Sequence, residues 1–389
     1  MQHEIPIAFA FDKNYLKTGA VALYSLLHAH RAVEGVFFSI YVFYSGLNED
    51  DLNRLQETIK PFKHFAALKC QDISATLDSL PTITDSAWVN RYSRMILVKY
   101  LLPSLFPQYS KMIWSDVDVV FCRTFADDFI ALDTSESFHL SGVISLVSQS
   151  VTEGFWFCNL DYMREHSFTQ QVLEKFKIQA MRPYFKEPTL IHHLHAYIKE
   201  LPLHYCVLPY YYQEELDDLR HKASLPIRFE IIHQDKPNEF IYRQRIPYEI
   251  SQIQDILSNP IIMHYESDKD ALGIYNGKPW EFPLGNQYHL WLEMLAHTPF
   301  WKDFTLEMQK KRIEYRDIAQ KIHYFSQDKR LYEVSIRSIK VFASHYYNLV
   351  VKERWSKPIK TFFQKNFFKK SSNLLESQGE AKSLIPMLS

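Results

Sequence analysis

The stretch Trp114-Ser115-Asp116-Val117-Asp118-Val119-Val120-Phe121 is the most informative part of the chain, because two carboxylates interrupt a run that is otherwise mostly apolar. Alternate residues of a strand point to the same side, so we expect Asp116 and Asp118 to present their oxygens together where the strand leaves its sheet. Mg²⁺ and Mn²⁺ prefer such oxygens and often complete their coordination with substrate phosphates. The pair predicts a divalent-metal site for a nucleotide-linked substrate, although Asp-x-Asp alone also occurs in ordinary turns.

The sequence upstream alternates between strand and helix patterns. Residues 5–11 form an apolar run typical of a buried strand, and we expect Thr18 to cap the helix that follows. Residues 37–43 predict a second strand, and Asn48 with the acidic residues after it predicts the start of a second helix. This βαβα order implies an α/β fold with a mainly parallel sheet.

The position of the Asp pair in that sheet follows from the segment before it. Residues 91–105 have helical periodicity, and Pro103 and Pro107 mark the end of the predicted helix. The Asp pair then lies at the carboxyl end of a central strand. Open α/β sheets bind their ligands at that edge, which strengthens the prediction of a functional site.

Composition limits the classes of protein that fit. With 389 residues, of which 47% are hydrophobic and 15% aromatic, the chain can bury a large core, so we expect one large domain with an appendage. The formal net charge of −1 gives no bulk argument for a nucleic-acid binder. No basic region precedes the apolar run 5–11, which is too short for a signal peptide or a membrane span.

The cysteines indicate neither a zinc knuckle nor a disulfide framework. Cys70, Cys122, Cys158 and Cys206 lie far apart and form no C-x-x-C pair. A reducing cytosol fits this pattern best. The cluster His192-His193-Leu194-His195 also lacks the cysteine or acid pair that would complete a tetrahedral metal site, so we interpret these histidines as structural.

Three segments, in this order, carry a resemblance to a known family: Phe9-Ala10-Phe11-Asp12-Lys13-Asn14-Tyr15; Tyr92-Ser93-Arg94-Met95 leading into Ser115-Asp116-Val117-Asp118; and His264-Tyr265 followed by Gly277-Lys278-Pro279-Trp280. Over residues 5–282 the chain resembles glycosyltransferase family 8, the retaining enzymes that include bacterial lipopolysaccharide galactosyl- and glucosyltransferases. The resemblance implies a GT-A fold, with a mainly parallel central sheet and a helical C-terminal extension. It also implies transfer of a hexose, galactose or glucose, from a UDP-sugar to a lipopolysaccharide or other surface-glycan acceptor.

The resemblance assigns roles to particular residues. Asp116, Asp118 and His264 are the implied ligands of Mn²⁺ or Mg²⁺, which acts as a Lewis acid on the departing diphosphate. The implied donor-binding residues are Ala10, Asp12, Asn14, Tyr15, Arg94, Gly277 and Lys278. Within that set, Asp12, Asn14 and Tyr15 correspond to uridine and ribose contacts, and Lys278 provides a point charge for the diphosphate beside a glycine that allows close backbone approach.

The chain departs from the family pattern in three places. The segment 265–276 is longer than the usual linker, so the position of Lys278 does not follow from the resemblance. Thr152-Glu153-Gly154 stands where the family has Asn-Ala-Gly, and Glu187-Pro188-Thr189-Leu190-Ile191 is the best match to a stretch of Asp-Gln-Asp type. Sugar transfer with retention of configuration requires either a carboxylate nucleophile or a front-face route, in which the leaving phosphate assists the incoming hydroxyl. Glu153 and Glu187 are therefore the candidate catalytic carboxylates. Their alternative role is that of surface acids.

Beyond Trp280 the sequence changes character. We expect a catalytic domain over 1–282, a helical appendage over 283–350, and a basic, aromatic tail over 351–389 that ends in disorder. The stretch 354–370 alternates cations with aromatic residues and contains no acid, a pattern typical of binding to an anionic membrane surface. The alternative is a helix that packs its Phe side on the domain. Together with the resemblance, the tail predicts a bacterial cytoplasmic protein, peripheral on the inner face of the plasma membrane.

Two other function classes stay open at this point. A sugar-nucleotide or nucleotidyl transferase on a similar fold would consume a nucleoside triphosphate. A nucleotide-binding or scaffolding protein that kept the metal fold but lost turnover would also fit the altered segments around Glu153 and Glu187. Product analysis distinguishes the first class, and turnover itself the second.

Overall fold

The computed structural model describes residues 2–80, 94–146, 151–179, 198–233, 236–266, 278–280 and 287–311. The chain divides into two compact units, Met1–Gln309 and Lys310–Ser389. The architecture given below is that of the first unit. The predicted catalytic residue Glu187, the predicted donor-binding residue Gly277, the three neighbouring histidines and the basic tail lie outside the described residues.

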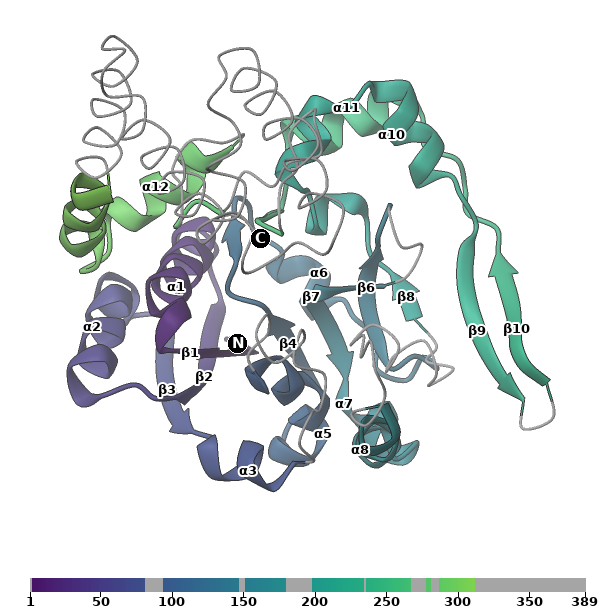
Figure 1. Ribbon diagram of the computed structural model, residues 1–389, viewed down its shortest axis with the longest axis horizontal. Helices are drawn as coiled ribbons and strands as arrows, with labels where there is room; N and C mark the ends of the chain where they lie inside the picture. Colours follow the sequence, from purple (N-terminus) through teal and green to yellow (C-terminus); the bar gives the residue numbers. More distant parts are fainter. Residues whose placement is uncertain are drawn as a thin grey trace, which may run out of the picture. The chain divides into compact units, whose positions relative to one another are not determined.

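A seven-stranded sheet forms the centre of the first unit (Figure 1). Its strands are β1 (His3–Asp12), β2 (Val36–Ser45), β3 (Ala66–Asp72), β4 (Lys111–Ser115), β6 (Leu140–Ile144), β7 (Val151–Asn159) and β8 (Ile198–Glu200). Their order is β3-β2-β1-β4-β7-β6-β8. Only β7 runs against its neighbours, so the sheet is mixed but mostly parallel. The prediction of an α/β fold with a mainly parallel sheet is confirmed.

Two small sheets accompany the large one. β5 (Val119–Phe121) pairs antiparallel with β11 (Ile262–His264), and β9 (Ile227–His233) pairs antiparallel with β10 (Lys236–Arg243). The first of these pairs matters for function, since it joins two segments that are more than 100 residues apart in sequence. The second extends away from the sheet as a hairpin in Figure 1.

Helices cover both faces of the central sheet. The α-helices are α1 (Leu16–His30), α2 (Glu49–Ile59), α3 (Ser74–Ser79), α5 (Leu102–Leu105), α6 (Ala126–Ile130), α7 (Leu160–Glu165), α8 (Phe168–Gln179), α10 (Leu216–Ala223), α11 (Ile250–Ser258) and α12 (Tyr288–Ala296), followed by a helix over 301–311. Short 3₁₀ helices are η1 (Lys13–Tyr15), η2 (Lys60–Phe62), η3 (Arg94–Leu101), η4 (Leu203–Tyr205) and η5 (Pro209–Gln213).

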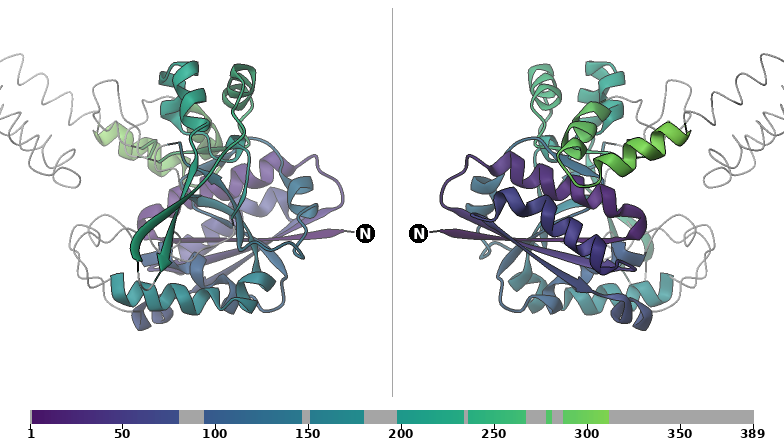
Figure 2. Two further views of the ribbon diagram at one scale, coloured as in Figure 1. Left: turned by 90° about the vertical axis from the view of Figure 1, so that its right-hand side faces the viewer. Right: turned by 90° about the vertical axis from the view of Figure 1, so that its left-hand side faces the viewer.

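The core has one layer on each face of the sheet. One layer joins α1, α2 and α12 to the sheet, and the other joins α3, η3, α5, α7 and α8 to its opposite face. Figure 2 shows the sheet nearly edge-on between α1 and α8. Alternate residues of β7 point into the two core layers: Phe155 and Phe157 pack in the first, and Trp156 packs in the second.

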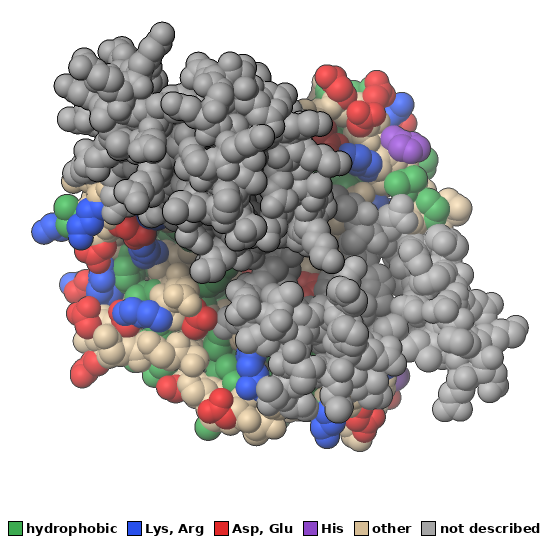
Figure 3. Space-filling view, viewed as in Figure 1, with side chains coloured by type: hydrophobic (Ala, Val, Ile, Leu, Met, Phe, Trp, Pro, Cys, Tyr) green, Lys and Arg blue, Asp and Glu red, His purple; other side chains and the backbone are tan. Residues whose placement is uncertain are grey.

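On the surface of the unit, charged side chains of both signs intermingle over α10 (Figure 3).

Several helices and strands were predicted from local sequence signals, with mixed success. The predicted strands 5–11 and 37–43 are confirmed as the central parts of β1 and β2. The helix predicted at Asn48 is confirmed as α2, which begins with a capping box between Asn48 and Asp51. The prediction that Thr18 caps the first helix is wrong. The chain enters α1 through η1, where Asp12 accepts a hydrogen bond from the Asn14 N–H, and Thr18 is buried inside α1.

The single helix predicted over residues 91–105 is also wrong. Its described part consists of η3 followed by the one-turn helix α5. Pro103 lies in the first turn of α5, where its missing N–H leaves no hydrogen bond unmade, so it helps to start that helix instead of ending the one before. The tighter 3₁₀ winding of η3 changes which side chains face the sheet.

The compact unit continues beyond residue 282. Trp291 and Leu295 of α12 are buried in the same core as α1. Arg54 of α2 donates a hydrogen bond of 2.6 Å to Asp303, and its guanidinium lies 3.9 Å from the centre of the Phe300 ring. The segment predicted as a helical appendage therefore starts inside the first unit, which extends to Gln309.

Burial of His30 makes the fold sensitive to acid. Its Nδ1 lies 2.8 Å from the Leu26 carbonyl, and its Nε2 accepts a hydrogen bond of 3.1 Å from the Phe125 N–H, so the neutral ring links α1 to the start of α6. Burial lowers the pKa of His30 from 6.5 to about 4, against the opposing effect of the Leu26 hydrogen bond. The unfolded chain therefore binds the proton more tightly than the folded one between these values, and the free energy of unfolding falls as the pH falls through that window.

We predict that His30 alone makes the protein about 2 kcal/mol less stable at about pH 5 than at about pH 7. Urea titrations of the wild type and His30→Gln at both pH values measure this effect. The Gln carboxamide oxygen can still accept from Phe125 N–H but does not titrate, so the stability difference between the two proteins should shrink in acid. An equal pH dependence in both proteins would contradict the prediction.

Candidate active site

The topology of the sheet determines where a ligand can enter. From β1 the chain crosses to β2 on one side, whereas β4 lies on the other side of β1, so the strand order reverses between β1 and β4. The loops diverge at such a point and leave a crevice at the carboxyl ends of the strands. β1 ends there at Asp12, and β4 ends at Ser115, directly before Asp116.

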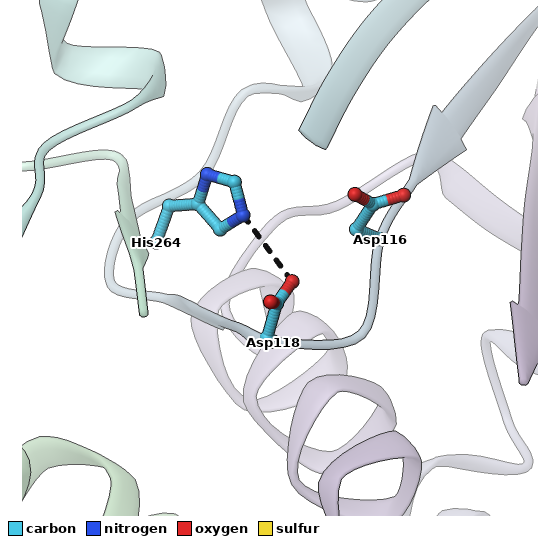
Figure 4. A group of neighbouring side chains, drawn as sticks. All are labelled: Asp116, Asp118 and His264. Atoms are coloured by element: carbon cyan, nitrogen blue, oxygen red, sulfur yellow. Dashed lines mark hydrogen bonds and ion pairs between the residues drawn. The ribbon is translucent and has the colours of Figure 1, made fainter. Parts of the chain in front are cut away.

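Asp116 and Asp118 lie in a bend between β4 and β5, so the continuous strand expected over 114–121 is interrupted. β11 lies beside β5 with His264 opposite Val119, and the Tyr265 N–H donates a hydrogen bond of 2.7 Å to the Asp118 carbonyl. This register brings the imidazole to the Asp pair. Figure 4 shows the three side chains turned toward one another, and their candidate ligand atoms all lie within 4.8 Å of each other.

Asp118 is the electrostatic centre of the cluster. His264 Nε2 lies 3.2 Å from one of its oxygens, and Lys278 Nζ lies 3.0 Å from the other. Burial favours the protonated acid, but the charges of Lys278 and His264 outweigh it and hold the pKa of Asp118 well below its usual range. The same pair raises the pKa of His264 well above its usual value, although burial opposes the change. Asp118 is therefore an anion stabilised by the Lys278 ammonium and by the imidazole of His264.

Asp116 has different partners. Its Oδ1 accepts a hydrogen bond of 3.0 Å from the Trp114 indole, and its backbone N–H donates one of 2.8 Å to the Gly154 carbonyl. Burial, and then the neighbouring Asp118, raise the pKa of Asp116, while the charge of Lys99 opposes this. A cation between the two carboxylates would relieve their repulsion.

The residues present suit a divalent cation. Two carboxylates and one imidazole are ligands that Mn²⁺ accepts readily. Opposite ligands of an octahedral ion with bonds of about 2.1 Å are about 4.2 Å apart, so small inward movements from the observed spread of 4.8 Å would close the set.

Gly154 makes room for the imidazole. A Cβ at this position would lie 2.5 Å from Cε1 of His264, closer than real contacts allow. The cause is a bulge in β7: Gly142 of β6 pairs with Trp156, and Ile144 with Val151, so residues 152–155 of β7 stand opposite a single residue of β6. The ring also contacts Cys206, whose Sγ lies 3.5 Å from Nδ1 of His264.

Lys278 joins the first and last predicted motifs. Its Nζ lies 5.0 Å from the centre of the Trp280 ring and 5.8 Å from that of Tyr15, and these two rings meet edge to face at 5.8 Å. The structure thus brings Tyr15, Asp118 and Lys278 together, although 160 residues separate the last two.

Comparison with known proteins identifies the family. The model of glycosyl transferase family 8 matches residues 6–282. The chain belongs to glycosyltransferase family 8. It is a glycosyltransferase, and among the alternatives left open by the sequence this membership favours sugar transfer. A search of curated proteins finds no match.

Solved structures show the same fold. The bifunctional glycosyltransferase WbbM, in its apo form, superposes with a TM-score of 0.59 at 15% sequence identity, over 78% of this chain and 52% of WbbM. The chain therefore spans about half of that larger protein. The galactosyltransferase LgtC, in complex with donor and acceptor sugar analogues, superposes with a TM-score of 0.54 at 14% identity, over 77% of this chain and all of LgtC. Both neighbours are glycosyltransferases, so the chain has the GT-A fold implied by the resemblance.

The other predicted donor-binding residues that the structure describes lie in β1, η1 and η3. Ala10 is half-buried near the carboxyl end of β1, and Asp12 and the exposed Asn14 form the turn after it. Arg94, at the start of η3, donates a hydrogen bond of 2.8 Å to the Leu80 carbonyl. Among the described residues, no hydrogen bond or ion pair joins Arg94 to the metal cluster.

Sequence reasoning missed two residues near the cluster. Lys99 is only 1% exposed, and its Nζ lies 3.1 Å from Oε2 of Glu153. The sequence signal for a buried Lys99 was its isolated position in the apolar run from Met95 to Leu102, but the same pattern also fits a lysine on the solvent-exposed side of a helix. Gly154 was noted only as part of an altered motif, because the bulge that turns it toward His264 is a tertiary feature.

We predict that Gly154→Ala weakens Mn²⁺ binding by about tenfold or more, because the new methyl group displaces His264 from the carboxylates. Electron paramagnetic resonance of free Mn²⁺ during titration measures the affinity.

Gly142→Ala is a matched control for this experiment. Its Cβ would lie 2.6 Å from a methyl group of Val151, a comparable clash that involves no candidate metal ligand. Both variants should lower the melting temperature, but only Gly154→Ala should weaken Mn²⁺ binding. Equal Mn²⁺ affinities in the two variants would count against the assigned role of His264.

Proposed function

We propose that this enzyme transfers a hexose, galactose or glucose, from a UDP-sugar to a lipopolysaccharide or other surface-glycan acceptor, with retention of configuration and with Mn²⁺ or Mg²⁺. The observation that supports this most directly is the cluster of Asp116, Asp118 and His264 at the switch point of the sheet, with Lys278 against Asp118. The similar structure of LgtC is that of a galactosyltransferase with donor and acceptor sugar analogues, which agrees with this choice of substrates.

The donor's nucleotide has complementary partners at the carboxyl end of β1. In this proposal the Tyr15 ring stacks on the uracil, while Asp12 and Asn14 bind the base or the ribose. Ala10 lies beside them on β1, and Arg94 and Gly277 also contact the donor. Lys278 is close enough to Asp118 to share its charge with an incoming diphosphate, because a Lys ammonium binds phosphate as a point charge. A divalent ion held by the cluster would supply the remaining neutralisation of the leaving diphosphate.

The sugar-side chemistry is assigned to carboxylates. Glu153 lies in the β7 bulge directly before Gly154, which contacts His264. Glu187 is the second proposed carboxylate and lies outside the described residues. Retention then proceeds either through a carboxylate nucleophile or through a front-face route, in which the leaving phosphate assists the acceptor hydroxyl.

Metal-dependent binding of UDP tests the donor site. Calorimetric titration of UDP in the presence of Mn²⁺ should show binding that EDTA abolishes and that His264→Ala weakens by about tenfold or more. His204→Ala is a suitable control, since His204 forms a hydrogen bond with Asp255 and is not a member of the metal cluster. UDP binding that is indifferent to EDTA and to both substitutions would refute the proposed metal and donor site.

We also propose that the tail 351–389 binds the anionic inner face of a bacterial plasma membrane, which would bring the cytoplasmic enzyme to lipid-linked acceptors. The support is its sequence, with basic and aromatic residues and no acid over 354–370. Among the residues that the structure describes, no helix is both long and apolar enough to cross a membrane.

Removal of residues 351–389 should release the protein from phosphatidylglycerol vesicles in a sedimentation assay. Each Lys or Arg near an anionic surface contributes about 1 kcal/mol. A full-length variant in which Lys357, Lys360, Lys365, Lys369 and Lys370 become Gln should therefore also dissociate, because it keeps the aromatic residues but loses five of the six positive charges of 354–370. Undiminished sedimentation of the truncated protein would exclude the tail as the membrane-binding segment.

A further inference from the structure

A buried ion pair borders the metal cluster. Lys99 of η3 and Glu153 of the β7 bulge lie with Nζ and Oε2 3.1 Å apart, and their side chains are 1% and 13% exposed. The ammonium also faces the rings of Trp156, at 5.2 Å, and Tyr100, at 5.6 Å.

Packing alone does not require this pair. The surrounding core is aromatic and aliphatic, and apolar residues of similar volume often stabilise such a position as well as an ion pair does, because burial removes both charges from water. The pair therefore points to a use other than stability. The family pattern has Ala in the aligned Asn-Ala-Gly segment, so the carboxylate is a departure of this chain.

The position of the pair links it to the site. Glu153 precedes Gly154, whose carbonyl accepts the Asp116 N–H and whose missing side chain makes room for His264. The charge of Lys99 also acts on Asp116, where it counters the rise in pKa caused by burial. Glu153 thus lies beside the metal cluster, close to where the sugar of a donor whose diphosphate is bound there would project.

The two oxygens of Glu153 are in different environments. Oε2 faces Lys99 and the Tyr100 hydroxyl, at 3.1 and 3.5 Å. Oε1 is buried and has no hydrogen-bond partner among the residues that the structure describes. A buried acceptor without a partner is costly, so a ligand that donates a hydrogen bond there is favoured. The ammonium on Oε2 also draws charge away from the carboxylate, which suits a fixed acceptor better than a nucleophile.

We propose that Oε1 of Glu153 accepts a hydrogen bond from a hydroxyl group of the donor hexose, and that Lys99 is a positioning residue that holds the carboxylate in place. This inference rests on the proposed use of a UDP-hexose. It assigns Glu153 to sugar recognition instead of covalent catalysis, and it gives Lys99 a role that acts only through Glu153.

The test compares the binding of UDP, UDP-glucose and UDP-galactose by calorimetry with Mn²⁺. Glu153→Ala should weaken the better-bound UDP-hexose by about 10- to 100-fold and leave the affinity for UDP within about twofold. Glu153→Gln should behave similarly, because the amide oxygen would turn to Lys99 and leave an NH₂ group, a donor, at the position of Oε1.

Lys99 is tested by a double-mutant cycle. Lys99→Met should also selectively weaken UDP-hexose, but should add nothing in the Glu153→Ala background. Lys99→Arg should restore part of the loss, because it keeps the charge. Lys111→Met is the control for loss of a lysine, since Lys111 donates to the carbonyls of Phe129, Ile130 and Leu132, away from the cluster, and should change only stability.

The outcomes separate the inference from the function on which it rests. Failure of wild-type protein to bind UDP would overturn the proposed function and the inference with it. UDP binding with an equal loss of UDP and UDP-hexose affinity in Glu153→Gln would overturn only the inference. So would a Glu153→Gln protein that binds UDP-hexose normally but no longer turns over, since that result identifies a nucleophile. If Lys99→Met does not fold, the Glu153 and Lys99→Arg variants still decide the question.

Discussion

The close approach of two carboxylates, Asp116 and Asp118, is the constraint on which the organisation of the site depends. At a separation of about 4 Å, two like charges near a protein surface repel each other by about 4 kcal/mol. Groups from separate segments offset this repulsion: His264 on β11 and Lys278 act on Asp118, and Lys99 of η3 acts on Asp116. A divalent cation is the natural complement of an acidic pair that is already held in this way, which is why the cluster supports a metal-dependent transferase.

Much of the fold could be predicted from the sequence because it depends on local signals. The apolar runs of β1 and β2 and the capping residue Asn48 act over a few neighbours, and their order implies a mainly parallel sheet. The placement of the Asp pair at a ligand-binding edge follows from that topology alone. Errors arose where a neighbouring element decides the local structure: Thr18 lies inside α1 because η1 precedes it, and Pro103 starts a helix that it was expected to end.

The residues that surround Asp116 and Asp118 could not be predicted from local sequence patterns. Lys99 lies in an apolar segment where helical periodicity does not distinguish a buried charge from a solvated one, and its partner Glu153 is 54 residues away. The role of Gly154 depends on a bulge in β7, which in turn depends on the register with β6. These residues are brought together by strand pairing and not by sequence spacing. The roles of Glu187 and Gly277, which lie outside the described residues, stay predictions.

Two parts of the site, the segment that carries Lys278 and the β7 bulge that carries Gly154, differ in how tightly the fold constrains them. The long segment between His264 and Lys278 does not prevent Lys278 from reaching Asp118 at 3.0 Å, in keeping with loop-closure entropy, which grows by only about 0.6 kcal/mol for each doubling of loop length. The position of His264 does not depend on that segment, because β5–β11 pairing fixes it independently. The β7 bulge is more tightly constrained, since one added methyl group at Gly154 would displace His264. The bulge therefore leaves no room for a side chain at position 154, and substitution in this segment is confined to neighbouring positions such as Glu153.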